Sequence, residues 1–168
     1  IEKLKLQKIR TEQAQVKLQK SHDELEQRKK HMEIILHHIT TGVVFVDSQW
    51  RVNSLNPASE RLLGVEESEV KGQDLKLIGG AQFKKHLWLP MMELLTKFDQ
   101  GQVQCHFIHS GREIALFANA NKIIDSQQEK IGYLIVIDDA LEQTKKQRVL
   151  AWKEVARRIA HEIKNPIT

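Results

Sequence analysis

The sequence predicts an α+β domain: a five-stranded antiparallel sheet with short helices on one side, flanked by helical segments at both ends of the chain. Short stretches of alternating apolar residues occupy the middle of the chain, separated by Gly and Pro. Residues 1–39 and 141–165 contain neither Gly nor Pro and are rich in helix-forming residues. Two strands precede the helical part of the middle and three follow it, which favours an antiparallel sheet with its helices grouped together.

The composition favours a modest core with polar flanks. Of the 168 residues, 40% are hydrophobic and 29% are charged, and the net charge is +4. Basic residues are interleaved with acidic ones along the chain, which is typical of a solvated surface, so no nucleic-acid partner is predicted. The single cysteine, Cys105, excludes an internal disulfide framework and a multi-cysteine metal site and fits a reducing compartment.

The ends of the sequence indicate a piece of a longer protein. The first residue is Ile1 rather than Met, and the last lies two residues beyond Pro166. No apolar run approaches the roughly 20 residues that span a bilayer, and no signal peptide is visible. We therefore expect any membrane anchor to lie upstream of this chain.

Residues 1–38 are predicted to form an N-terminal coiled-coil signalling helix. One heptad seam runs through Leu4, Thr11, Leu18, Leu25, Met32 and Ile39. Its companion seam is largely polar, running through Gln7, Ala14, Ser21, Arg28 and Ile35. A sustained seven-residue repeat with polar companions predicts a weak parallel dimer, and the alternative is a single solvated helix.

Residues 39–140 are predicted to form the α+β domain itself. A hairpin pairs residues 43–46 with a second strand in which Trp50, Val52 and Ser54 share one face. Asn56-Pro57 then supplies a helix N-cap followed by Pro at the first helical position, and Gly64 ends that helix. Residues 66–99 are mostly helical, and three strands follow. Two longer strands, around residues 103–107 and 114–120, show alternating residues, and the last is the apolar run 133–137.

Residues 141–168 are predicted to be a second helical segment. A tight heptad seam runs through Val149, Trp152, Ala156, Ile159 and Ile163. Upstream, the same seam falls on the polar residues Glu142 and Lys145. The coil is therefore expected to be poorly packed where it leaves the sheet, so a signal could change the helix packing there at little cost.

The end of this segment carries the residues with the clearest chemistry. With Ala156 at heptad position a, His161 falls at position f and faces away from the seam. A carboxylate such as Glu162 can hold the proton of one imidazole nitrogen and leave the other nucleophilic. Asn165 lies one turn further along the same face, and Pro166 is expected to kink the helix. A zinc motif of the His-Glu-x-x-His type fails, because Asn165 occupies the position of the second histidine.

The hexapeptide from His161 to Pro166 resembles the H-box of sensor histidine kinases, and residues 151–160 are similar to the NtrY-like nitrogen-regulation sensor kinases. This resemblance implies that His161 accepts the γ-phosphoryl group of ATP, bound with Mg, and passes it to an aspartate on a response regulator. It further implies that Glu162 is the activating acid/base group and that Asn165 positions water for phosphatase activity.

Residues 31–140 look like a PAS domain, with the segment from Asn56 to Gly64 matching its usual first helix. Asp138-Asp139-Ala140-Leu141 resembles the Asp-Ile-Thr-type signal at the end of such domains. Leu141 stands where Thr is usual, so we expect the hydrogen bonding of that signal to be altered.

Further expectations follow from the same resemblance. The parent protein would be a homodimer and a bacterial inner-membrane protein, of which this is a cytoplasmic portion, attached to the membrane only through missing N-terminal segments. Its partners would be an NtrX-like response regulator and the ATP-binding domain of the same protein. Because this chain has no Gly-rich nucleotide loop, it should not phosphorylate itself.

We expect no resident cofactor or metal in this chain. His86 is the candidate haem ligand and Cys105 the candidate flavin-reactive thiol, but a lone helical histidine and a strand cysteine are poor evidence for either group. His106 and His109 are three residues apart on a strand, so they face opposite sides. The large aromatic residues are expected to fill the core, namely Trp50, Trp88 and Phe117.

Two other functions stay open alongside the signal relay. The PAS domain could recognise a cytosolic metabolite in its own pocket, or the chain could serve as a dimerisation scaffold with no signalling role. An added mass or a shifted melting temperature with a small molecule would favour the first of these alternatives.

Overall fold

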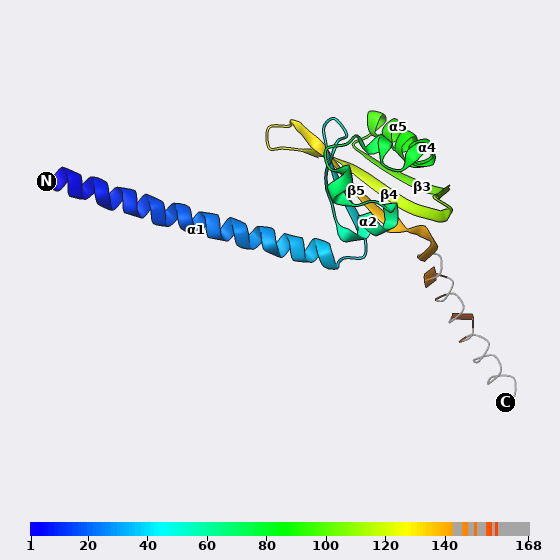
Figure 1. Cartoon of the computed structure of the whole chain (residues 1–168), viewed down its shortest axis with the longest axis horizontal. Coiled ribbons are helices and arrows are strands. Elements are labelled where there is room, and N and C mark those ends of the chain that lie inside the picture. Colours follow the sequence, from blue (N-terminus) through cyan, green and yellow to red (C-terminus); the bar gives the residue numbers. More distant parts are fainter. Residues whose placement is uncertain (143–145, 148–149, 151–153, 156, 158–168) are drawn as a thin grey trace. The chain divides into compact units, whose positions relative to one another are not determined.

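The computed structural model describes residues 1–142, 146–147, 150, 154–155 and 157 (Figure 1). The chain divides into two compact units, Ile1–Ile39 and Thr40–Thr168. Within the described residues, no helix combines the length and the apolar character needed to cross a bilayer.

The first unit is a single helix, α1, which spans Glu2–His38 and is 37 residues long. It ends where Ile39 adopts an extended conformation. No residue of α1 is buried, and the apolar residues of the predicted seam are largely exposed, with Leu18 at 72% and Leu25 at 62%. The predicted dimer along this seam stays a prediction.

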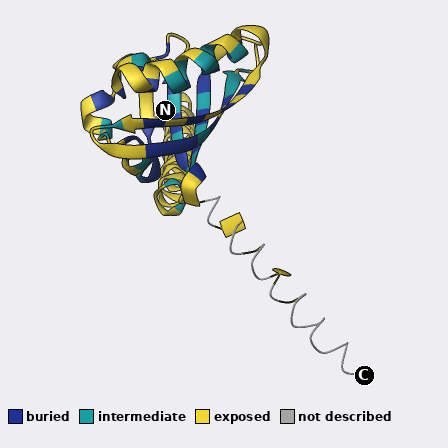
Figure 2. Cartoon of the chain, turned by 90° about the vertical axis from the view of Figure 1, so that its right-hand side faces the viewer, coloured by how far each residue is buried: buried dark blue, intermediate teal, exposed yellow. Residues whose placement is uncertain are grey.

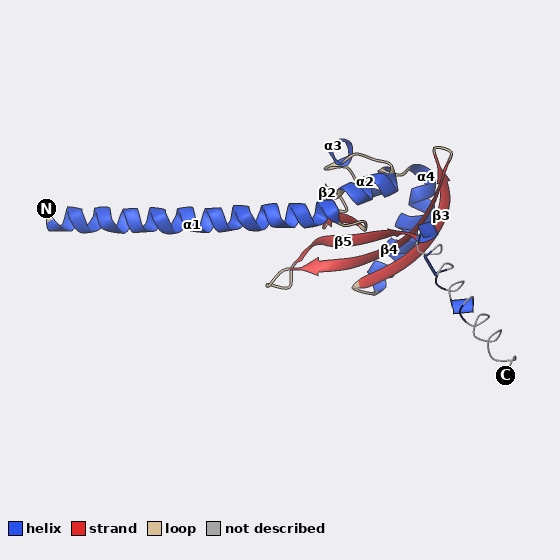
Figure 3. Cartoon of the chain, turned by 90° about the horizontal axis from the view of Figure 1, so that it is seen from below, coloured by secondary structure: helices blue, strands red, loops and turns tan. Residues whose placement is uncertain are grey.

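The second unit contains a five-stranded antiparallel sheet, which confirms the predicted fold class (Figure 3). Its strands are β1 (Gly42–Asp47), β2 (Val52–Leu55), β3 (Gln100–His109), β4 (Arg112–Ile124) and β5 (Lys130–Asp139). They lie in the order β2-β1-β5-β4-β3, and every neighbouring pair is antiparallel. The last strand in the sequence, β5, therefore lies at the centre of the sheet.

The helices between β2 and β3 are short, and together they cover one face of the sheet (Figure 3). In chain order they are α2 (Pro57–Leu63), α3 (Glu67–Val70), the 3-10 helix η1 (Leu75–Leu77), α4 (Gly80–Phe83), the π-helix η2 (Lys84–Trp88) and α5 (Leu89–Lys97). A continuous apolar core fills the space between them and the sheet. Figure 2 marks the buried residues of the chain in dark blue. The largest fully buried side chains of that core include Leu116 and Ile137.

The predicted caps of α2 and the predicted turn between β3 and β4 are formed as the sequence indicates. The side chain of Asn56 caps α2 by accepting a hydrogen bond from the Ser59 N–H, and α2 ends at Gly64, which has φ 70°. At the β3–β4 hairpin, Ser110 and Gly111 both have positive φ, 52° and 75°. A turn with two positive φ values matches the twist of the strands it joins, which explains the long, regular pairing of β3 with β4.

The predicted alternation of β2 is wrong at both of its ends. Trp50 lies in the turn before the strand, with φ 64°, rather than in the strand itself. A bulge then shifts the register, so that Phe45 pairs with Ser54 but Val46 pairs with Val52. Ser54 is consequently exposed and Leu55 takes the buried position. Periodicity alone misses such a shift because one extra residue reverses the face of every later side chain.

Candidate functional site

A small cavity lies between the sheet and the helices of the second unit. Its volume is about 20 Å³, which is room for a single water-sized molecule. The lining is apolar and consists of Val44, Trp50, Leu63, Leu75, Phe83, Leu87, Trp88, Met91, Ile135 and Ile137. A ligand larger than water enters only if these walls move apart, because ligand sites for drug-sized molecules measure about 300–1,000 Å³.

Trp50 forms one wall of this cavity through an unusual backbone conformation. Its φ of 64° is in the left-handed region, which is uncommon for a bulky residue. Two backbone hydrogen bonds hold it there: the Trp50 N–H donates to the Asp47 carbonyl at 3.0 Å, and the Leu75 N–H donates to the Trp50 carbonyl at 2.9 Å. The ring then stacks on Tyr133 of β5, with centroids 4.1 Å apart.

Trp88 forms the opposite part of the aromatic wall and meets Trp50 edge to face, with centroids 6.5 Å apart. It ends the π-helix η2, directly before α5. Pro90 has no N–H to donate to the carbonyl of His86, and the wider π turn absorbs this missing bond. In the described part of the chain, the indole Nε1 of Trp88 is the buried side-chain atom that lacks a hydrogen-bond partner. A buried donor without an acceptor is costly. The cavity wall is apolar throughout, so this N–H does not face the cavity.

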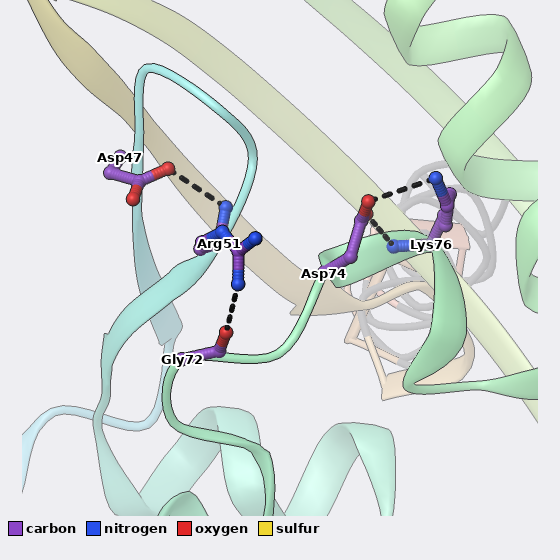
Figure 4. A network of polar contacts seen from close by, with 5 residues as sticks. All are labelled: Asp47, Arg51, Gly72, Asp74 and Lys76. Carbon is purple, nitrogen blue, oxygen red and sulfur yellow. Dashed lines mark hydrogen bonds and ion pairs between the residues drawn. The ribbon is translucent and has the colours of Figure 1, made fainter.

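The turn that carries Trp50 is fastened to the segment before η1 by a polar network (Figure 4). Asp47 Oδ1 accepts from the Arg51 N–H at 2.9 Å, and Arg51 Nη1 donates to the Gly72 carbonyl at 3.3 Å. Arg51 also forms an isolated antiparallel bridge with Asp74. These contacts join the two segments whose neighbouring residues Trp50 and Leu75 line the cavity.

Asp74 is the last residue before η1 and connects this network to that helix. Its carboxylate accepts from the Lys76 N–H at 3.1 Å and pairs with Lys76 Nζ at 2.9 Å (Figure 4). Partial burial raises the pKa of Asp74, but the two hydrogen bonds from Lys76 and the charges of Lys76 and Arg51 lower it by more. The net pKa lies below the ordinary value, so the carboxylate is ionised at neutral pH.

A second polar cluster lies where the chain enters and leaves the sheet. Asn56 is 5% exposed, and its Oδ1 accepts from the Val43 N–H at 2.7 Å and the Ser59 N–H at 3.0 Å. Its Nδ2 donates to the Thr41 carbonyl at 3.0 Å. The amide therefore caps α2 and also ties α2 to the segment that leads into β1. The Asn-Pro pair in the sequence predicts the helix cap but not the bonds to the segment before β1.

The end of β5 carries two further bonds. Thr41 Oγ1 donates to Asp138 Oδ1 at 2.8 Å. Asp139 Oδ1 accepts from the Leu141 N–H at 2.8 Å and the Glu142 N–H at 3.2 Å, so it caps the helical residues that begin at Ala140. The hydrogen bonds found at this position use two aspartates as acceptors, and one of them is bound by a threonine from the start of the domain. The alteration expected from Leu141 stays a prediction.

The residues predicted to carry phosphotransfer chemistry, His161, Glu162 and Asn165, lie outside the described residues. So do all five residues of the heptad seam between Val149 and Ile163. Their predicted roles stay predictions. The described chain reaches toward them through helical positions 140–142, 146–147, 150, 154–155 and 157.

The candidate metal and cofactor residues are dispersed. His86 stacks on Phe107, with centroids 6.3 Å apart, and is not among the residues that line the cavity. His106 is exposed and pairs with Glu113 across the β3–β4 hairpin. Within the described residues, no three His, Cys, Asp or Glu side chains are grouped as metal ligands.

Two predictions about buried residues have different outcomes. Cys105 lies on β3, as predicted, and is buried, which raises the pKa of its thiol to about 11. The prediction that Phe117 fills the core is wrong. The same prediction is confirmed for Trp50, which belongs to the core, and for Trp88, which packs against the core. Leu116 and Ala118 point into the core, so Phe117 between them is half-buried on the opposite face of the sheet.

Known proteins resemble the chain over most of its length. It is 34% identical over 148 residues to the nitrogen regulation protein NtrY of Azorhizobium caulinodans, covering 87% of this chain and 18% of that protein. It is 26% identical over 145 residues to the signal transduction histidine-protein kinase AtoS of Escherichia coli, covering 81% of this chain and 23% of that protein. The chain thus spans about a fifth of the length of these two relatives.

Solved structures share the fold of the second unit. The PAS domain of Bordetella pertussis BvgS has a TM-score of 0.59 at 17% identity, covering 77% of this chain and 98% of that one. A PAS domain from Colwellia psychrerythraea has a TM-score of 0.55 at 18% identity, covering 68% and 95%. The family model described as the PAS fold matches residues 30–140. The chain belongs to the PAS family.

Proposed function

We propose that this chain is the cytoplasmic signal-relay part of a two-component sensor histidine kinase. Its PAS domain passes an input through the flanking helices to the phosphoacceptor His161. One observation carries the proposal: the likeness to NtrY and to the histidine-protein kinase AtoS extends over 148 and 145 residues, well beyond the PAS match at 30–140. The cap by Asp139 supports it, because it starts a helical segment directly at the end of the central strand.

The chemistry at His161 follows the reactivity of imidazole. A ring nitrogen attacks the γ-phosphorus of Mg-bound ATP, a P–N bond forms, and the bond to the ADP leaving group breaks. Glu162 takes the proton from the other ring nitrogen. The phosphoryl group then passes to an aspartate carboxylate of a response regulator, and the imidazole is regenerated. Asn165 orients a water molecule for hydrolysis in the phosphatase direction.

The partners of the proposed relay follow from this chemistry. A second copy of the chain pairs along the apolar seam of α1, and the ATP-binding domain of the same parent protein supplies the nucleotide. An NtrX-like response regulator receives the phosphoryl group. The parent protein reaches a bacterial inner membrane only through segments upstream of Ile1.

Phosphorylation of His161 provides the direct test. The parent protein, or this chain extended beyond Thr168, is incubated with its ATP-binding domain and γ-labelled ATP. We expect label that is lost in acid and kept in alkali, and no label on His161→Ala. His22→Ala, which removes an exposed histidine of α1, is the matched control and should label like the wild type. Equal labelling of His161→Ala would refute the phosphoacceptor assignment.

A second candidate function is recognition of a cytosolic metabolite by the PAS domain. The apolar cavity between the sheet and the helices favours it, because a small apolar molecule that moves these walls apart would be buried there. Native mass spectrometry of the purified chain and melting curves with metabolite mixtures test this function. If neither an added mass nor a shifted melting temperature is found and His161 is not labelled, a dimerisation scaffold is the remaining function.

A further inference from the structure

The register of β1 and β5 places Thr41 directly opposite Asp138. The ladder runs from Asp47 opposite Gly132 to Gly42 opposite Ile137, and it ends there. The next pair outward would be Thr41 and Asp138. These two residues are joined by their side chains, Thr41 Oγ1 donating to Asp138 Oδ1 at 2.8 Å. The side-chain bond thus extends the ladder by one step at the point where the chain enters and leaves the sheet.

Each end of this bond is attached to a different element. The Thr41 carbonyl accepts from Asn56 Nδ2, which also caps α2. Asp138 is still paired with Phe117 of β4 on its other side, and the next residue, Asp139, caps the helical residues at 140–142. A continuous polar path therefore runs from α2 through Asn56 and Thr41 to the end of β5.

The surroundings give Asp138 alternative partners. A groove of about 550 Å³ opens beside the bond, and Thr41, Asp138 and Asp139 contribute to its walls. Three cations line the same groove, namely Arg61, Arg112 and Lys146. Lys146 is paired with Glu142, which also lines the groove, at 3.4 Å, so the two arginines are the alternative partners. An aspartate released from Thr41 has both space and opposite charge within this groove, which are the conditions for a second discrete arrangement.

We propose that the Thr41–Asp138 hydrogen bond is a latch that couples the segment entering the sheet to the helical segment leaving it. Closed, it holds the end of β5 from the β1 side and keeps the Asp139 cap in place. Open, Asp138 keeps its pairing with β4 but loses its bond to the β1 side, and the cap loosens. Resting on the proposed relay function, the latch sets how strongly the PAS domain constrains the helix that leads to His161. Thr41 is a positioning residue, without chemistry of its own.

Hydrogen exchange on this 168-residue chain tests the coupling without any kinase activity. Thr41→Val removes the donor and keeps the shape. We expect the Leu141 and Glu142 amides to exchange about 5-fold faster in this variant, on the order expected for the loss of one hydrogen bond. Exchange at Ala118, in the middle of β4, should be unchanged. Thr41→Ser retains the hydroxyl and should restore slow exchange.

Thr40→Val is the matched control, because Thr40 is the exposed neighbour of Thr41 and has the same side chain. It should leave the Leu141 and Glu142 amides unchanged within about 2-fold. Unchanged exchange at these amides in Thr41→Val would overturn the coupling. So would faster exchange that Thr41→Ser fails to restore, or that Ala118 shares, since both point to general destabilisation.

The regulatory role is tested in the parent protein by the rate of His161 labelling. Thr41→Val should change that rate by about 3-fold or more relative to Thr40→Val, as expected for a modest coupling free energy between sites. A change in exchange with an unchanged labelling rate would overturn the role in output. If the wild type itself carries no label at His161, the proposed function fails, whereas the exchange result still decides the coupling.

Discussion

The indole ring of Trp50 stacks on the phenol ring of Tyr133, with centroids 4.1 Å apart and planes inclined by 20°. The stack joins the β1–β2 turn to β5, the central strand that leads out of the domain. Trp50 also lines the inner cavity, and the Leu75 N–H holds its carbonyl. Trp50 thus connects the cavity wall to the strand that carries Asp138 near its end.

Truncating Trp50 should cost much of the stability of the PAS domain. Trp50→Ala removes a side chain that is 9% exposed together with its stacking on Tyr133, and we expect the free energy of unfolding to fall by about 3–5 kcal/mol. Trp50→Phe keeps a ring and should cost less. Urea unfolding followed by circular dichroism measures both changes.

The comparison for Trp50 is an aromatic residue outside the core. Phe98 is 59% exposed, so Phe98→Ala should change stability by no more than about 0.5 kcal/mol. Equal effects of Trp50→Ala and Phe98→Ala would contradict the assignment of Trp50 to the core.

The stability of the variant Asn56→Asp should depend on pH. Asn56→Asp keeps an acceptor for the Val43 and Ser59 N–H groups but replaces the donor to the Thr41 carbonyl with an anionic oxygen. The resulting repulsion should cost about 1–3 kcal/mol at neutral pH. Burial and the facing carbonyl raise the pKa of the new carboxyl, whereas the Val43 and Ser59 N–H groups lower it. We expect the net shift to be upward, so that the folded state binds the proton more tightly than the unfolded state.

The sign of this pH effect follows from proton linkage. A folded-state pKa above the unfolded value means that stability falls as pH rises through that range. The difference between Asn56→Asp and wild type should therefore shrink when unfolding is measured at acidic pH, where the carboxyl is protonated and can donate again. Asn56→Ala, which has no titratable group, should show a constant deficit. A deficit of Asn56→Asp that does not vary with pH would contradict the Nδ2–Thr41 bond.

Sequence periodicity predicts most of this fold because burial is regular along its strands. In β3 the residues 101, 103, 105 and 107 are buried and their neighbours are exposed, as strict alternation requires. Asn56, Gly64 and the Ser110-Gly111 turn are likewise local signals, since each acts on residues only a few positions away.

The parts that sequence does not predict depend on contacts between distant residues. Thr41 and Asp138 are 97 positions apart, and neither belongs to a local motif that indicates the other. The left-handed Trp50 needs the hydrogen bond from Leu75, and the bulge in β2 is set by pairing with β1. The alternation of β4 places Phe117 on the outer face of the sheet. The prediction that Phe117 is buried failed because it relied on the residue's aromatic character and not on this alternation.

The buried thiol of Cys105 should lower the free energy of unfolding of the domain in alkaline solution. Burial raises the pKa of its thiol from 9.0 to about 11, against a smaller lowering by the Leu116 backbone hydrogen bond. The folded state thus holds the proton longer, so this contribution is intact below pH 9 and is lost as pH rises toward 11. The free energy of unfolding should fall by about 1.4 kcal/mol per pH unit in that interval from this group alone.

The variant Cys105→Ala isolates the thiol from other titrating groups. Its stability relative to wild type should be constant up to pH 9 and should improve between pH 9 and 11. The native thiol should also resist alkylation at pH 8 until the chain is unfolded, because the thiolate is the nucleophile. Rapid alkylation of the folded chain would contradict the buried position.

The two residues proposed to assist His161 should separate kinase from phosphatase activity. Glu162→Gln removes the acid/base group but keeps the side chain's size, so the rate of His161 labelling should fall by about 10²–10⁴-fold. Asn165→Ala removes the amide that orients water, so hydrolysis should slow while labelling of His161 continues. Single-turnover labelling and chase measurements in the parent protein give the two rates separately.

The matched control for both variants is Glu129→Gln, an exposed carboxylate in the loop between β4 and β5. It should leave the chemical step unchanged and serve as the baseline. If Glu162→Gln labels at the rate of Glu129→Gln, the acid/base role is wrong. If Asn165→Ala slows labelling and hydrolysis equally, its amide does not act on the attacking water. A group that orients this water should slow the hydrolysis of phosphohistidine and leave the rate of labelling unchanged.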